Sequence, residues 1–78
     1  MEKDIRNRLG PTIKFYRQRM GITQQHLAEC MNSQGIMIDR TIIVKIENQT
    51  RGLNVHEIDA IVKIFQIDYN DFFTDISK

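Results

Sequence analysis

Four short segments of this chain repeat one helix-starting device, and together they determine most of its expected secondary structure. In each segment an apolar residue precedes a residue that can cap a helix, and a second apolar residue follows the cap four positions later. This hydrophobic staple sets the angle at which the chain enters a helix. Glu57 also lies three positions after Asn54, which predicts a capping box. The four staples are Ile22-Thr23 with Leu27, Ile38-Asp39 with Ile43, Leu53-Asn54 with Ile58, and Ile67-Asp68 with Phe72.

A fifth helix is expected ahead of these four, between Gly10-Pro11 and Gly21. Proline is favoured at the first position of a helix, and glycine readily takes the left-handed conformation that stops one. One face of this helix is marked at helical spacing by Ile13, Tyr16, Arg17 and Met20. The chain is therefore predicted to be all-α and compact, with five helices at residues 11–20, 23–31, 39–48, 54–65 and 68–75.

Size and composition leave room for one small domain. The chain has 78 residues, of which 41% are hydrophobic, and it contains no apolar run near the roughly 18 residues of a membrane-spanning helix. With Cys30 as the single cysteine there is no internal disulfide, and with no visible signal peptide we expect a cytoplasmic location. Residues 1–9 are expected to form an amino-terminal arm or helix extension, and residues 10–78 the domain.

The charge is distributed unevenly although the net charge is only +1. Residues 1–53 hold nine basic and five acidic residues, a net +4, whereas residues 54–78 hold two basic and five acidic residues, a net −3. A basic amino-terminal part is typical of a surface that binds a polyanion. Chance partition of surface charge explains the same numbers equally well.

The segment 39–48 shows why the basic residues matter. It buries an apolar stripe and still presents two cations and a hydroxyl on its outer face, near its start. Because helices 23–31 and 39–48 are short and joined by a turn, they indicate a helix-turn-helix. In that motif the second helix enters the major groove of DNA with its first residues at the base edges. The outer face holds Arg40, Thr41, Val44 and Lys45.

These segments resemble the Cro/C1-type helix-turn-helix regulators, also called the XRE family. The match is carried by "GITQQHLAE" and "IDRTIIVKIEN" within residues 21–48, and "LNVHEIDAIVKIFQIDYNDFF" resembles the family's following helices. The resemblance implies a lambda-repressor-like DNA-binding domain with a central helix-turn-helix. It also implies a sequence-specific transcriptional regulator, a phage-, prophage- or mobile-element-type repressor acting at the bacterial nucleoid.

One departure from the family pattern is a turn between the two helices that is about five residues longer than usual. It resembles a subfamily with a lengthened turn, in which Gly35-Ile36 and Ile38-Asp39-Arg40 fit the usual residues. We expect Ile36 or Met37 to tuck onto the core. The family's glycine after the recognition helix is Gln49 here, so Asn48 is expected to take the left-handed stop.

The resemblance implies a set of DNA contacts. Gln24 would hold a phosphate at the start of the second helix, although a solvated glutamine is the alternative. Arg40 suits a guanine edge, and Thr41 offers a hydroxyl and a methyl group. Lys45 would reach a base or a phosphate, and Val44 a thymine methyl. The full DNA-binding set is Thr23, Gln24, Arg40, Thr41, Val44, Lys45, Asn48 and Arg51.

Two further pairs are implied by the resemblance. Arg17 and Glu47 would form a partly buried ion pair that is structural and holds the recognition helix in place. Phe73 and Ile76 would form the seam of a homodimer. Because one recognition helix covers only about four to six base pairs, two copies would bind a pseudo-palindromic operator in double-stranded DNA.

Other classes of function find little support in the residues. His26 and Cys30 are four residues apart on one helix, but two ligands make a poor zinc site, so no metal or cofactor is expected. No catalytic motif is present, and we expect no enzyme. The alternative that remains is an antitoxin-like or protein-interaction module, which binds a protein partner and DNA only secondarily.

Overall fold

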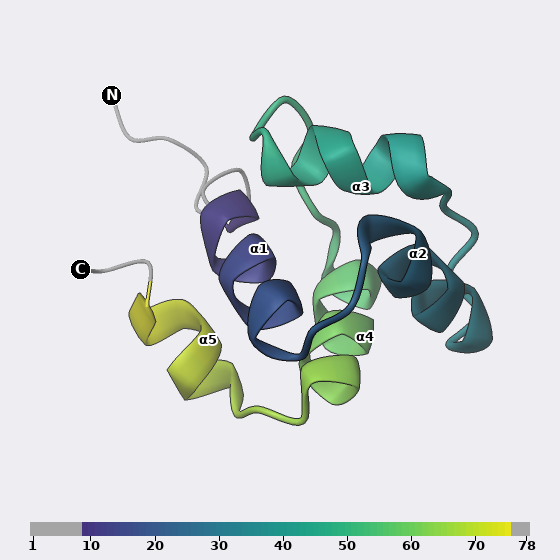
Figure 1. Ribbon diagram of the computed structural model, residues 1–78. Helices are drawn as coiled ribbons and strands as arrows, with labels where there is room; N and C mark the ends of the chain where they lie inside the picture. Colours follow the sequence, from purple (N-terminus) through teal and green to yellow (C-terminus); the bar gives the residue numbers. More distant parts are fainter. Residues whose placement is uncertain (1–8, 76–78) are drawn as a thin grey trace.

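The computed structural model describes residues 9–75 of the backbone and the side chains of residues 9–72. Over this range the chain is all-α and has no strand, as the sequence predicts. In Figure 1, α4 lies between α1 and α2, and α3 crosses above them. None of the described helices is long and apolar enough to cross a membrane. The helices are α1 (Gly10–Arg19), α2 (Gln24–Ser33), α3 (Arg40–Glu47), α4 (Val55–Phe65) and α5 (Tyr69–Asp75).

The helix starts follow the caps that the sequence predicts. The side chains of Thr23 and Asp39 accept hydrogen bonds from the amides three positions later, at the starts of α2 and α3. At the start of α4, Asn54 and Glu57 form the complete capping box. Each cap supplies an acceptor for an amide that has no partner inside the helix, and each contributes about 1 kcal/mol to stability.

The first four helices end in the same way, with a left-handed or near-left-handed residue that turns the chain. The amide of the residue that follows it donates a hydrogen bond to the carbonyl five residues earlier, as in Ile22 to Arg17 and Thr50 to Lys45. This is the Schellman arrangement. The prediction that Asn48 takes the left-handed position is wrong, because Asn48 stays right-handed and Gln49 has a φ of 64°. The left-handed residues are Gly21, Gly35, Gln49 and Gln66.

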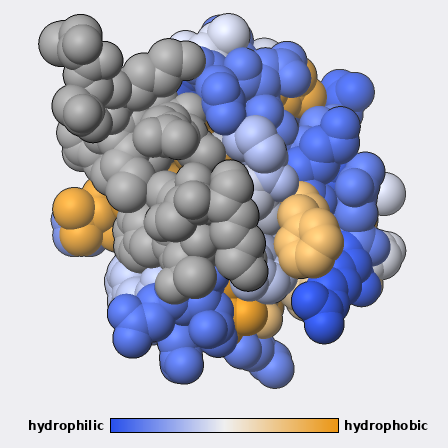
Figure 2. All heavy atoms as spheres, turned by 90° about the vertical axis from the view of Figure 1, so that its left-hand side faces the viewer, coloured by the Kyte–Doolittle hydropathy of each residue, from blue (hydrophilic) through white to orange (hydrophobic). Residues whose placement is uncertain are grey.

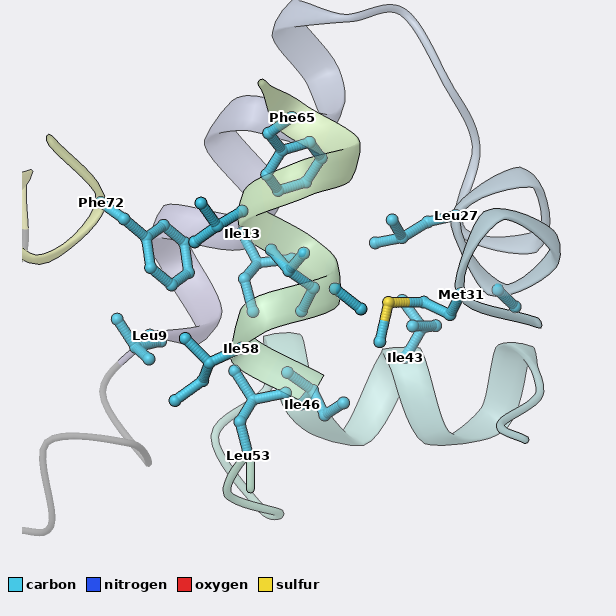
Figure 3. Close-up of a cluster of buried hydrophobic side chains, with 14 residues drawn as sticks. Leu9, Ile13, Leu27, Met31, Ile43, Ile46, Leu53, Ile58, Phe65 and Phe72 are labelled. Atoms are coloured by element: carbon cyan, nitrogen blue, oxygen red, sulfur yellow. The ribbon is translucent and has the colours of Figure 1, made fainter. Parts of the chain in front are cut away.

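The core gathers around α4, which receives side chains from the other helices (Figure 3). Phe72 of α5 and Ile61 of α4 are completely buried. Leu9, which the sequence places in the arm, is also completely buried, so the core begins one residue before the expected boundary. Met20, which was expected on the same helix face as Ile13, is 48% exposed, because α1 ends at Arg19 and the chain turns away there.

Gly10 allows α1 and α3 to approach each other at the backbone. A β-carbon placed on Gly10 would lie 2.7 Å from the carbonyl oxygen of Glu47 and closer still to that of Ile46. Both atoms belong to the backbone of α3, so no side chain can move aside to make room. The first turn of α1 therefore supports the last turn of α3.

Gln49 gives a test of the left-handed helix stop. Left-handed backbone costs a residue with a β-carbon about 1–2 kcal/mol, and glycine avoids most of that cost. We expect Gln49→Gly to raise the free energy of unfolding by about 0.5–1 kcal/mol. The matched control is Gln18→Gly on the exposed face of α1, where the same change should lower stability by a similar amount. Urea denaturation of both variants measures this, and a loss of stability in Gln49→Gly would contradict it.

Candidate nucleic-acid interface

α3 presents one buried side and one exposed side. Ile43 and Ile46 pack in the core, and Glu47 is buried beside them. On the other side Arg40, Thr41, Lys45 and Asn48 are exposed, with Val44 half-buried at the border. Five of the residues predicted to contact DNA therefore lie on or beside one continuous surface of α3.

The Arg17–Glu47 ion pair that the resemblance implies is present and joins α1 to α3. The Arg17 guanidinium donates to both oxygens of Glu47, from Nε at 2.7 Å and from a terminal nitrogen at 3.2 Å. Its other terminal nitrogen donates to the Ile22 carbonyl at 2.9 Å. The side chains are only 11% and 3% exposed, so both charges are largely removed from water and depend on each other.

Gln24 joins this ion pair through its side chain. Its amide nitrogen donates to Glu47 Oε1 at 3.1 Å, so the first residue of α2 is bonded directly to the end of α3. The prediction of a phosphate contact from this side chain is untested. Thr23 is likewise engaged as the cap of α2, where its hydroxyl oxygen accepts from the His26 amide at 3.0 Å.

Arg51 lies in an ion pair that the sequence prediction missed. Its two terminal nitrogens donate to the two oxygens of Glu57 at 3.0 and 2.9 Å, and one of them also donates to the Gly52 carbonyl. The predicted DNA contact would have to share these groups. The sequence predicted other roles for both partners, a DNA contact for Arg51 and a capping box for Glu57, and nothing in their spacing indicated the pair.

The ionisation of this pair is shifted in the direction that favours both charges. Burial acts to raise the pKa of the Glu57 carboxyl, but hydrogen bonds from Arg51 and from the Asn54 amide outweigh it and leave the pKa below its ordinary value. The hydrogen bond with Glu57 raises the pKa of Arg51, against a smaller opposing effect of burial. Glu57 therefore stays charged while it caps α4 and holds the chain that follows α3.

The lengthened turn between α2 and α3 spans Gln34 to Asp39. Of the two residues expected to reach the core, Ile36 packs against it and Met37 does not, being 86% exposed. Asn32, a residue that no sequence pattern singled out, bonds to the backbone of this turn. α2 itself runs two residues further than expected, to Ser33, which shortens the irregular segment.

Two expectations fall on residues outside those that the structure describes: the amino-terminal arm or helix extension, at residues 1–8, and the dimer seam. The predicted dimer seam consists of Phe73, whose backbone lies in α5 but whose side chain is outside the described set, and Ile76, which is outside it altogether. Among the described residues, no three His, Cys, Asp or Glu side chains are grouped to hold a metal ion. His26 and Cys30 thus gain no further ligand within residues 9–72.

Comparison with known proteins adds no family assignment. No protein-family model matches this chain, and no curated protein matches it in sequence. The resemblance to the XRE family therefore remains a prediction that rests on the residues themselves.

The ion pair between α1 and α3 predicts a large effect of Glu47→Ala. Removing the carboxylate leaves Arg17 buried without its partner, which costs about 3–5 kcal/mol. The exposed acid Glu29 provides a control with the same change in charge, and Glu29→Ala should stay within about 0.5 kcal/mol of wild type. Thermal and urea unfolding measure both. Unchanged stability in Glu47→Ala would show that the pair does not hold the helices together.

Acid should weaken the protein in part through Glu57. Because its pKa is lower in the folded than in the unfolded chain, its stabilising effect is complete above the unfolded value of about 4.3 and is lost as pH falls through the folded pKa. Glu57→Gln should therefore destabilise the protein at pH 7, and its difference from wild type should shrink steadily below about pH 5.

The control for this acid effect is Asp59, an exposed carboxylate whose pKa is lowered by hydrogen bonds from Tyr69 and Lys63. Salt at 1 M should suppress the smaller effect of Asp59→Asn and leave most of the effect of Glu57→Gln. Urea denaturation between pH 3 and 7 at low and high salt measures both. A constant difference between Glu57→Gln and wild type across this range would contradict the assignment.

Proposed function

We propose that the protein is a sequence-specific DNA-binding transcriptional regulator that reads the major groove with α3. The observation that carries this proposal is the contrast between the two sides of α3. One side is fixed by the core and by Glu47, and the other leaves Arg40, Thr41 and Lys45 exposed. Direct readout of base edges requires a helix whose buried side is held rigidly and whose exposed side carries polar groups.

The dimensions of α3 suit a groove. An α-helix with its side chains is about 10–12 Å across, and the major groove is about 12 Å wide. The first residues of α3 would meet base edges, where the Arg40 guanidinium suits the two acceptors of guanine and Thr41 a hydroxyl contact. Lys45 and Asn48 lie one and two turns further and suit a base or phosphate oxygens.

One copy of α3 reaches too few base pairs to select a site in a genome. We propose that two chains bind together, with their α3 helices about 34 Å apart on successive major grooves. The operator would then be pseudo-palindromic. A weak contact between free chains is enough, because DNA that binds both of them stabilises the pair by linkage.

The second candidate is a module whose main partner is a protein. It is favoured by Phe15 on α1 and Met20 just after α1, which are 52% and 48% exposed. On the face of the molecule shown in Figure 2, however, the coloured hydrophobic residues form small areas separated by hydrophilic ones. Singly exposed apolar side chains are ordinary on a protein surface. DNA binding therefore ranks first.

Selection of duplexes from a random pool, followed by mobility-shift titration, tests the proposal. Arg40→Ala should lose about 1–3 kcal/mol on the selected operator and relax the preference at one base position. The control is Arg19→Ala, which removes an exposed cation that lies over the Phe15 ring and away from α3. That variant should keep the preference at every position.

The pattern of loss separates the possible roles of Arg40. An equal loss on all duplexes would assign Arg40 to a phosphate, and no loss would remove it from the interface. Recovery of no preferred duplex by the wild-type chain at moderate salt would contradict DNA readout and favour the protein-binding module.

A further inference from the structure

The turn before α3 has a fixed backbone shape. The Asn32 side chain donates from one nitrogen to two carbonyls of the turn, those of Ile36 at 2.8 Å and Ile38 at 3.0 Å. The Ile38 amide also donates to the Ile36 carbonyl at 3.1 Å, which closes a three-residue γ-turn. These three hydrogen bonds fix the backbone on both sides of Met37, the residue at the tip of the turn.

Met37 is the most exposed large apolar side chain of the described residues. It is 86% exposed, whereas its neighbours Ile36 and Ile38 both pack against the core. The two isoleucines attach the turn to the core, and the γ-turn directs the Met37 side chain toward solvent. Methionine is flexible and polarisable, so it adapts to an apolar partner of irregular shape.

Met37 lies just ahead of α3, three residues before Arg40. Together with Asn32, Ile38, Asp39 and Ile42 it lines a hollow of about 380 Å³ at the start of α3. No lysine or arginine lines this hollow, and Asp39 brings a carboxylate to it. The hollow therefore suits an uncharged apolar group and disfavours a phosphate.

We infer that Met37 contacts the C5 methyl group of a thymine beside the bases read by α3, and that Asn32 is the positioning residue that holds it there. The thymine methyl is the apolar group that the major groove displays. This inference rests on the proposed function. Under this inference the lengthened turn contacts a base in addition to α3.

The test removes the methyl group from the DNA and the side chain from the protein separately. Each thymine of the selected operator is replaced in turn by deoxyuridine, which differs from thymidine only by the absent methyl. At one position the wild-type protein should bind about fourfold more weakly, which is the change in affinity expected when one buried methyl-sized group is lost. Met37→Ala should bind the thymine operator more weakly and show no further loss at that position.

Asn32→Asp tests the positioning role, because it keeps the shape of the side chain and removes the N–H donors. It should lose the same sensitivity to deoxyuridine although Met37 is still present, a readout that a general loss of stability would not give. Val55→Ala is the control, since Val55 is exposed at the start of α4 and lines none of this hollow. It should respond to every deoxyuridine as wild type does.

The outcomes separate this inference from the proposed function. If wild type and Met37→Ala lose equally at every deoxyuridine, Met37 reads no thymine methyl, and sequence-specific binding through α3 still stands. If Asn32→Asp keeps the wild-type sensitivity, the positioning role is overturned. If no duplex is preferred at all, the proposed function and this inference fail together.

Discussion

The carboxylate of Glu47 lies where three segments of the chain meet. It accepts two hydrogen bonds from Arg17 of α1 and one from Gln24 of α2, while its own backbone ends α3. A buried ion pair seldom adds much net stability over apolar packing, because removing two charges from water is costly. What the ion pair does supply is specificity in the relative orientation of the helices. The bidentate geometry favours one relative orientation of these segments more strongly than apolar contacts between isoleucine side chains do.

Every exposed residue of α3 depends on that orientation. The helix is only eight residues long, so its own hydrogen bonds cannot keep it folded without support from the rest of the domain. Support comes from Ile43 and Ile46 in the core, from Glu47 at one end and from the Asp39 cap at the other. The side chains that we propose to meet DNA carry none of these contacts. The protein therefore separates the residues that position the surface from the residues that compose it.

The sequence predicts the features that depend on neighbouring residues and misses those that depend on the path of the chain. The caps at Thr23, Asp39 and Asn54 and the five helices follow from local spacing, and the structure has them. The bonds of Asn32 and the pair of Arg51 with Glu57 join residues four to six positions apart, but they depend on the irregular path of the turns, which no periodic pattern encodes. The pair of Arg17 with Glu47, 30 positions apart, was predicted only through the family resemblance.

The candidate site shows the same division in more detail. The exposed and buried sides of α3 follow from its apolar period, and the structure agrees. The choice between Ile36 and Met37 for the core could not be made from composition, since both are apolar. The left-handed stop was placed one residue early, because asparagine tolerates that conformation better than glutamine. The exact end of α3, however, is set by its packing against α1.

The close approach at Gly10 has a consequence for the evolution of this chain. Because only hydrogen fits between that α-carbon and the two carbonyls of α3, any homologue that keeps the arrangement must keep glycine there. The outer residues of α3 face no such restriction. Homologues should therefore vary freely at exposed positions of α3 such as 40 and 41, while position 10 stays invariant. A glycine at the start of one helix would then mark relatives whose exposed α3 surfaces no longer resemble one another.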